Sequence, residues 1–217
     1  ERVRFVGMPS TRQLWDKQNC HVGDRQRLFT AVGEGLSGVE RVLYAGSYVD
    51  VAPSFVWGSV TYVDVDRRAA KFFADTEGVQ AIIAEAAGEE EAARREVAFL
   101  HADYCSALPL PEEGFDLLVS LYAGFVSEAC VKYLKVGGTL LVNPSHGDVA
   151  LVSVDERFEL VGVVNSARGD YCVSTKGLDD YLVPKKEVDL SKEAIKQRNR
   201  GVAYKKSAFA YLFKRVH

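Results

Sequence analysis

The sequence predicts an α/β fold: a doubly wound, mainly parallel sheet of seven strands, with helices on both faces and an antiparallel last strand. Two observations lead to this prediction. Short apolar runs rich in β-branched and aromatic residues alternate with segments of helical periodicity. Several of these runs also end on a glycine or an acidic residue, which is typical of parallel strands whose carboxyl ends open onto a ligand crevice.

The N-terminal segment 1–38 is expected to form a helical cap. Asp24 precedes apolar residues at helical spacing, which indicates an amphipathic helix with Asp24 as its N-cap. Trp15 and His21 fall in a polar loop before that helix, where we expect a packed Trp and a solvated His, with a wall of the binding site as the alternative. Because the chain starts with Glu1 and not with Met, we also expect a short leader to be missing.

The next stretch reads as strand, tight turn, short helix, strand. Residues 41–45 form an apolar run that closes on Gly46, and residues 60–63 form a second run that closes on Asp64 and Asp66. Two parallel strands joined by a helical crossover make a βαβ unit, whose carboxyl ends face a ligand crevice. An acid at the tip of the second strand therefore lies where it can bind a ribose diol.

The remaining elements follow in alternation. Helical patterns predict a helix over 67–87 and a solvated charged stretch over 88–95. A further helix over 125–134 is expected to stop at Gly137-Gly138. A basic helix over 191–200 is expected to be capped by Ser191 and stopped by Gly201. Further strands are predicted at 97–100, 115–121, 139–142, 158–164 and 208–216. We expect one domain overall, 39–217, with the cap before it and an insertion at 165–207 that holds a hairpin over 171–183.

Composition excludes few classes of function. The 217 residues carry a net charge of −3, which favours no nucleic-acid partner, although residues 185–217 contain ten Lys or Arg against three Asp or Glu. The four cysteines lack zinc-ligand spacing, so no metal is expected. We find neither a signal peptide nor an apolar run that could cross a membrane, and free thiols in the cytoplasm are the expectation.

The loop after the first strand discriminates between cofactors. A dinucleotide site needs a GxGxxG loop so that the backbone can approach a pyrophosphate. Here the loop runs Gly46-Ser47-Tyr48-Val49-Asp50, in which Tyr48 fills the space and Asp50 repels a diphosphate. NAD and FAD are therefore disfavoured, and a nucleoside ligand that carries a positive centre and no phosphate is favoured.

The order of elements over 41–164, with the last strand, resembles the Rossmann-type (class I) S-adenosylmethionine-dependent methyltransferase family. The family's acid after strand two, which holds the ribose, matches Asp64, and its adenine-binding Asp after strand three matches Asp103. The acid, Leu-Pro and Phe-Asp pattern before strand four is also similar, in Leu108-Pro109 and Phe115-Asp116. The resemblance implies S-adenosylmethionine as cofactor, S-adenosylhomocysteine as product, and cofactor contacts at Ala45, Gly46, Ser47, Tyr48, Asp50, Asp64, Val65, Asp103, Tyr104, Ser120 and Leu121.

The chain departs from the family's pattern at two places. Tyr44 stands where the family has an acid on its first strand, and the loop keeps one glycine of three, with Tyr48 and Asp50 at the other positions. Structural roles remain open as well, since Asp64 or Asp50 can cap a following helix and Asp103 can be a turn residue.

Methyl transfer requires an acceptor held in line with a sulfonium methyl group. The predicted proton acceptors are Tyr122, at the tip of strand four, and His146, past strand five, with a pocket wall and a surface loop as their alternative roles. The tip lacks the Asn/Asp-Pro-Pro-Tyr/Phe signature of amino-methylating enzymes. We therefore expect a small-molecule methyltransferase. The alternatives are a catalytically inactive protein of this fold that binds a nucleoside or a protein partner, and a nucleic-acid methyltransferase.

Overall fold

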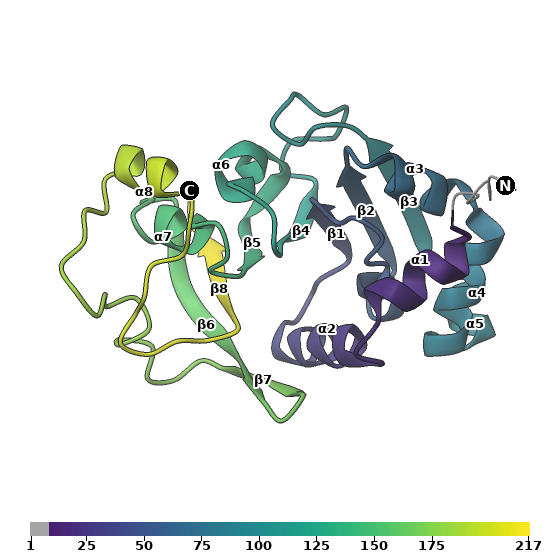
Figure 1. The fold of residues 1–217 in the computed structure, drawn as a ribbon, viewed down its shortest axis with the longest axis horizontal. Helices are drawn as coiled ribbons and strands as arrows, with labels where there is room; N and C mark the ends of the chain where they lie inside the picture. The colour runs from purple at the N-terminus through teal and green to yellow at the C-terminus, as the bar shows by residue number, and fades with distance from the viewer. Residues whose placement is uncertain (1–8) are drawn as a thin grey trace, which may run out of the picture.

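The computed structural model of the protein describes residues 9–217, so part of the predicted cap lies outside the described residues. An eight-stranded sheet runs through the molecule in the order β3-β2-β1-β4-β5-β8-β6-β7 (Figure 1). The strands are β1 Arg41–Ala45, β2 Ser59–Asp64, β3 Glu96–His101, β4 Phe115–Ser120, β5 Leu134–Val142, β6 Phe158–Ala167, β7 Asp170–Ser174 and β8 Ala210–Arg215.

The strand directions confirm the predicted fold class. Strands β1 to β5 are mutually parallel, and β8 lies between β5 and β6, antiparallel to both. The eighth strand, β7, pairs antiparallel with β6 across a turn in which Arg168 and Gly169 both have positive φ. The prediction of a separate hairpin over 171–183 is therefore wrong, because this segment begins by extending the sheet instead.

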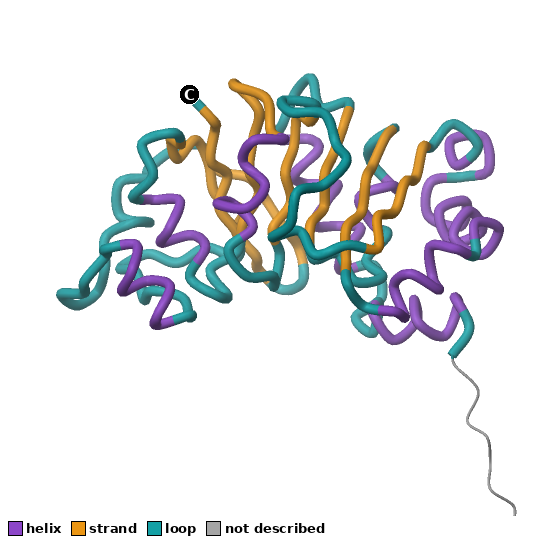
Figure 2. Tube along the Cα trace, turned by 90° about the horizontal axis from the view of Figure 1, so that it is seen from above, coloured by secondary structure: helices purple, strands orange, loops and turns teal. Residues whose placement is uncertain are grey.

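Helices cover both faces of the sheet, as Figure 2 shows in a view from above. They are α1 Thr11–Gln18, α2 Asp24–Gly35, α3 Arg67–Ala74, α4 Thr76–Ala87, α5 Glu89–Ala92, α6 Val126–Cys130, α7 Asp148–Ser153 and α8 Lys192–Arg198, with single turns η1 Ala52–Phe55 and η2 Val131–Tyr133. Side chains alternate across a strand. Val42 and Tyr44 accordingly pack into one apolar cluster with α1 to α4, whereas Leu43 and Ala45 pack into another with α6 and α7.

The N-terminal region contains one helix that the sequence analysis placed in a loop. Helix α1 begins with a capping box, in which Ser10 and Gln13 bond each other's backbone N–H groups. Trp15 lies on this helix, is 5% exposed, and packs edge to face on Phe55 at 5.6 Å between ring centroids. At the start of α2 the N-cap is Gly23, with φ of 76°, and not Asp24, which is the first helical residue.

The predicted helix 125–134 is shorter, and its glycine stop is wrong. Helix α6 and turn η2 end at Tyr133, and β5 starts at the next residue, so Gly137 and Gly138 lie inside a strand. A Cβ at Gly138 would lie 3.0 Å from the carbonyl oxygen of Asp116, and Gly137 has φ of 85°. Gly138 therefore allows β5 to approach β4 closely, and Gly137 provides the positive φ, where the pairing register shifts.

Two other helix ends have clear local causes. The predicted helix 67–87 divides at Asp75, whose carboxylate accepts hydrogen bonds from the N–H of Gly78 and from the hydroxyl of Thr11 on α1. Ser191 caps α8 as expected, but that helix ends at Asn199, with φ of 45°, and not at Gly201. Within residues 9–217, none of the helices has the length and apolarity that a membrane crossing requires.

Candidate cofactor site

Two cavities open at the carboxyl ends of the parallel strands, and Gly46 lines both. The larger cavity, of about 420 Å³, lies against the loop after β1, the start of α2 and the tip of β4. Its lining residues are Gln18, His21, Asp24, Arg25, Tyr44, Gly46, Ser47, Tyr48, Leu121 and Tyr122. The smaller cavity, of about 240 Å³, is lined by Gly46, Asp64, Val65, Asp103 and Tyr104, at the ends of β2 and β3.

Gly46 is required where the two cavities meet. Its φ is 69°, and a Cβ at this position would lie 2.7 Å from the Cβ of Ala123, in the loop after β4. Its N–H donates to the carbonyl oxygen of Val63 on β2 at 2.8 Å. The loop after β1 is thus held between two neighbouring strand ends, and its backbone forms the floor of the site.

Asp64 holds this loop in place. Its carboxylate accepts from the N–H of Tyr48 at 2.7 Å and from the N–H of Asp66 at 2.8 Å. Tyr48 has φ of 49°, an uncommon conformation for a residue with a side chain, and its ring lies 5.1 Å from the guanidinium carbon of Arg68. Asp66 serves as a helix cap: its carboxylate accepts from the N–H of Arg68, at the start of α3, at 2.7 Å.

The smaller cavity presents acids beside an apolar wall. Asp103 is exposed, its Oδ1 accepts from the N–H of Cys105 at 2.9 Å, and its carboxylate also interacts with the thiol of Cys105. Tyr104 is partly buried and accepts from the N–H of Gly124 at 3.1 Å, and burial raises the pKa of its hydroxyl. Val65 is 61% exposed. Carboxylate acceptors therefore border a surface on which a flat ring can lie.

A buried ion pair forms the back of the larger cavity. Asp50 is fully buried, and its carboxylate lies 3.0 Å from Nε of Arg25 on α2. The carboxylate also accepts from the hydroxyl of Tyr44 at 3.2 Å and from the N–H of Ala52 at 3.4 Å. Burial raises the pKa of Asp50 against the opposing effects of Arg25 and Tyr44. For Arg25, burial lowers the pKa, but Asp50 together with Tyr44, Tyr122 and Asp24 outweighs the effect of burial and raises the pKa above its ordinary value.

The two departures from the family's loop pattern are thus in contact. Tyr44 replaces an acid on β1, and Asp50 supplies one six residues later that bonds to that tyrosine. Sequence reasoning missed the third partner, Arg25. The available signal is that α2 carries arginines at its start, since a buried acid requires a cation or several donors.

Tyr122 lies at the mouth of the larger cavity and is 57% exposed. Its backbone has φ of 57° and is held by a hydrogen bond from its N–H to Oδ1 of Asn143, at 3.0 Å. Its ring lies 5.6 Å from the guanidinium carbon of Arg25 and contacts Phe209 edge to face. Leu121, beside it, is buried at 2% exposure and contributes apolar wall.

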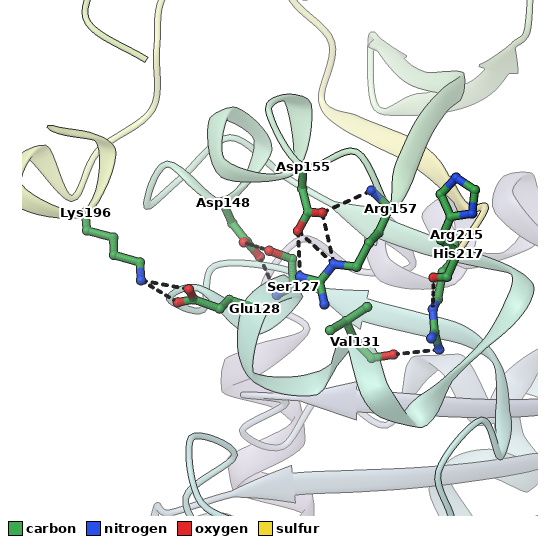
Figure 3. A network of polar contacts seen from close by, with 9 residues as sticks. All are labelled: Ser127, Glu128, Val131, Asp148, Asp155, Arg157, Lys196, Arg215 and His217. Carbon is green, nitrogen blue, oxygen red and sulfur yellow. Dashed lines mark hydrogen bonds and ion pairs between the residues drawn. The ribbon is translucent and has the colours of Figure 1, made fainter. Parts of the chain in front are cut away.

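Ser120 is turned away from the site by a buried acid. Its hydroxyl donates to Asp148 at 2.8 Å, and Asp148 also accepts from the N–H and the hydroxyl of Ser127. Figure 3 shows the Ser127 and Asp148 contact beside the ion pair of Glu128 and Lys196. Burial raises the pKa of Asp148 to about 6, against the lowering effect of these donors. The sequence analysis did not predict α7, the helix that carries Asp148.

Four predicted site residues line neither cavity: Ala45, Asp50, Ser120 and His146. His146 instead contacts the hydroxyl of Ser145 through Nδ1 at 3.0 Å, and Ser145 donates to Asn143. The larger cavity includes His21, for which a wall of the binding site was the alternative interpretation. Among residues 9–217 no cluster of three metal-ligating side chains occurs, and the four cysteines are free.

The sheet order and the antiparallel β8 between β5 and β6 define the class of fold: the protein has the Rossmann-type methyltransferase fold. Neither protein-family models nor curated proteins match the chain. Several solved structures do match the chain, at low sequence identity.

The N-methyltransferase NodS from Bradyrhizobium japonicum, solved with S-adenosylhomocysteine, is 14% identical over 74% of this chain and 88% of its own, with a TM-score of 0.48. An rRNA methylase from Streptococcus thermophilus is 10% identical over 87% of this chain and 94% of its own, with a TM-score of 0.44. The YcgJ protein from Bacillus subtilis is 18% identical over 58% of this chain, at a TM-score of 0.39, and the match spans 54% of its length. Because these sequence identities and TM-scores are low, the assignment of the fold rests on the strand order of the chain itself.

Proposed function

We propose that this protein is an S-adenosylmethionine-dependent methyltransferase, located in the cytoplasm, that acts on a small-molecule acceptor. The observation that supports the proposal most is the pair of cavities that share Gly46. A ligand with a nucleoside at one end and an amino acid at the other needs two adjoining cavities of different chemistry. The smaller cavity has carboxylates beside an apolar surface, and the larger has a guanidinium beside polar groups.

The residues of the smaller cavity fit the nucleoside. Asp64 keeps acceptor capacity beyond its two backbone bonds, and the exposed carboxylate of Asp103 has lone pairs left to accept from an amino group. Val65 and Tyr104 provide the walls for a purine ring. At the other end, Arg25 lines the larger cavity and offers donors to a carboxylate. The bound cofactor would supply a methyl group activated by a sulfonium.

The acceptor belongs in the larger cavity, beside Tyr122. Gln18, His21 and Asp24 make its lining polar, which favours a small polar acceptor. Asp24 already accepts from the hydroxyl of Tyr171 at 3.0 Å. His21 replaces His146 as the candidate proton acceptor, because His146 does not line this cavity.

A second candidate function is binding without catalysis. It is favoured by one observation: the loop is closed by the pair of Arg25 and Asp50 and by the side chain of Tyr48, where the family has glycines. A protein of this kind would bind the nucleoside and transfer no methyl group, and binding and turnover therefore have to be measured separately.

Calorimetric titration with S-adenosylmethionine, S-adenosylhomocysteine and NAD tests the proposal. We expect the first two to bind and NAD not to bind. Asp103→Ala should weaken binding by roughly 1 to 3 kcal/mol, since it removes the acceptor of the purine amino group. Asp103 is the better choice for substitution, because Asp64 also holds the backbone of Tyr48. Asp179→Ala, which removes an exposed acid outside both cavities, is the matched control and should bind like the parent protein.

Two results would contradict the proposal. One is that none of the three ligands binds to the folded protein. The other is that Asp103→Ala and Asp179→Ala bind equally well. Binding that is followed by no transfer to a panel of hydroxyl, amine and thiol acceptors would favour the second candidate function.

A further inference from the structure

A third cavity, of about 480 Å³, lies in the segment between β7 and β8, and cations dominate its charge. Its lining residues are Lys185, Lys186, Glu187, Val188, Arg198, Arg200, Gly201, Val202 and Ala203. Four of these side chains are cationic and one is acidic. Residues that are up to eighteen positions apart in the sequence thus surround one hollow, whereas the sequence alone suggested a solvated basic helix.

The cations of this cavity are not neutralised by ion pairs. Within the described part of the chain, none of Lys185, Lys186 and Arg200 lies within ion-pair distance of a carboxylate. Arg198 donates through Nη2 to the carbonyl oxygen of Asp189 at 3.1 Å, but its Nη1 is buried and has no partner among residues 9–217. A buried charged donor without an acceptor costs free energy, which an anion in the cavity would offset.

The surrounding backbone is held in place without a ligand. Lys185 donates its N–H to the carbonyl oxygen of Ala203 at 2.8 Å, next to a β-bridge between Pro184 and Tyr204. Helix α8 is tied to α6 by the ion pair of Lys196 and Glu128, which Figure 3 shows. The cationic side chains therefore extend from a backbone that is already ordered, which reduces the entropy lost on binding.

We propose that this cavity binds a small organic molecule that carries a phosphate group. A phosphate presents several oxygens to lysine and arginine donors at once. Val188, Val202 and Ala203 provide an apolar surface for the organic part. An RNA strand fits less well, because no aromatic side chain lines the cavity to stack on a base.

This site is distinct from the cofactor site and does not depend on the proposed methyl transfer. No residue lines both the cationic cavity and either of the cavities at Gly46. The two regions are linked through the loop after β5, since the N–H of Gly201 donates to the carbonyl oxygen of Ser145 at 3.3 Å.

Calorimetric titration of the full chain with inorganic pyrophosphate, at low salt, tests this inference. We expect the parent protein to bind it and the double variant Lys186→Gln, Arg200→Gln to bind at least about 10-fold more weakly, since the variant loses two cations that can form charge-assisted bonds to the anion. The matched control is Lys176→Gln, Lys205→Gln, which removes two exposed cations of the same segment that do not line the cavity. The control should stay within about 2-fold of the parent.

Thermal unfolding and S-adenosylhomocysteine binding are measured on the same variants, so that a folding defect is recognised and a failure of the cofactor proposal is seen separately. The inference is overturned if the folded parent does not bind pyrophosphate, or if the control loses as much affinity as the cavity variant. It is also overturned if an oligouridylate binds much more tightly than pyrophosphate and loses that affinity in both variants, because the basic segment would then be a surface for RNA.

Discussion

Two buried aspartates near the site are stabilised in different ways. Asp50 is paired with the guanidinium of Arg25 and accepts from a tyrosine hydroxyl. Among residues 9–217, the donors to Asp148 are two serine hydroxyls and one backbone N–H, and no cation forms an ion pair with it. Hydrogen bonds from neutral groups offset less of the cost of burying a charge than a cation does. The ionisation of Asp148, which no cation offsets among the described residues, should therefore weaken the fold.

The first prediction concerns the pH dependence that Asp148 causes. Burial raises its pKa in the folded protein to about 6, from an ordinary value of 3.8. Between these two values the folded state keeps a proton that the unfolded state has lost, so the free energy of unfolding should fall as pH rises from 4 to 6. The contribution is about 3 kcal/mol. In Asp148→Asn, whose amide can still bond both serines, this contribution should be absent.

Urea denaturation of both proteins at pH 4, 5, 6 and 7 measures the effect. The difference in the free energy of unfolding between Asp148→Asn and the parent should grow in favour of the variant as pH rises to 6, and then level off. Parallel pH profiles for the two proteins would show that Asp148 titrates normally in the fold.

At the scale of elements, an ion pair attaches α2 to the loop after β1. Its apolar face packs through Leu28, Phe29 and Val32, all fully buried, and Arg25 extends from its first turn to Asp50. The ion pair crosses from the N-terminal helices to the loop after β1. The helix thereby closes one wall of the larger cavity, and its position determines the shape of that cavity.

The second prediction follows from this attachment. Arg25→Met should lower the free energy of unfolding by about 3 to 5 kcal/mol, because it leaves the carboxyl of Asp50 buried without its cation. Arg27→Met, on the same helix, removes an arginine whose ion pairs are partly exposed, and should cost less than about 1 kcal/mol. Chemical denaturation at pH 7 measures both. Equal losses would mean that the pair of Arg25 and Asp50 contributes no more than a surface contact.

Element types were predictable from sequence where local signals agreed. The apolar runs of β1 and β2 and the cap of α8 at Ser191 are confirmed, because each is specified by residues within a few positions. The stop at Gly137-Gly138 and the hairpin over 171–183 are wrong, because both depended on tertiary pairing. Gly138 allows β5 to approach β4, and β7 extends the sheet beside β6.

At the scale of the whole molecule, the sheet carries two regions of different charge. The strands β1 to β5 present the two cavities with their acids, and the segment before β8 presents the cationic cavity. β8 joins these regions, since it pairs with both β5 and β6. One sheet therefore supports the two cavities that share Gly46 and a separate cationic cavity.

The location of the candidate cofactor site was predictable from topology, and its detailed lining was not. The acids after β2 and β3 follow from the rule that ligands bind at the carboxyl ends of parallel strands. The contribution of Arg25 depends on how the N-terminal helices dock, which no local pattern specifies. Ser120 was assigned to the site from its place at the end of β4, but its hydroxyl bonds to Asp148 on an unpredicted helix.

The central claim is that a nucleoside cofactor binds across the two cavities at Gly46. The most direct measurement is a titration of the isotopically labelled protein with S-adenosylhomocysteine, in which each backbone amide signal is followed by NMR. We predict that the largest shifts lie at Gly46, Ser47, Val65 and Tyr104, and that the signals of residues 185–203 change little. Shifts confined to residues 185–203, or none at all with saturating ligand, would contradict this account of the site.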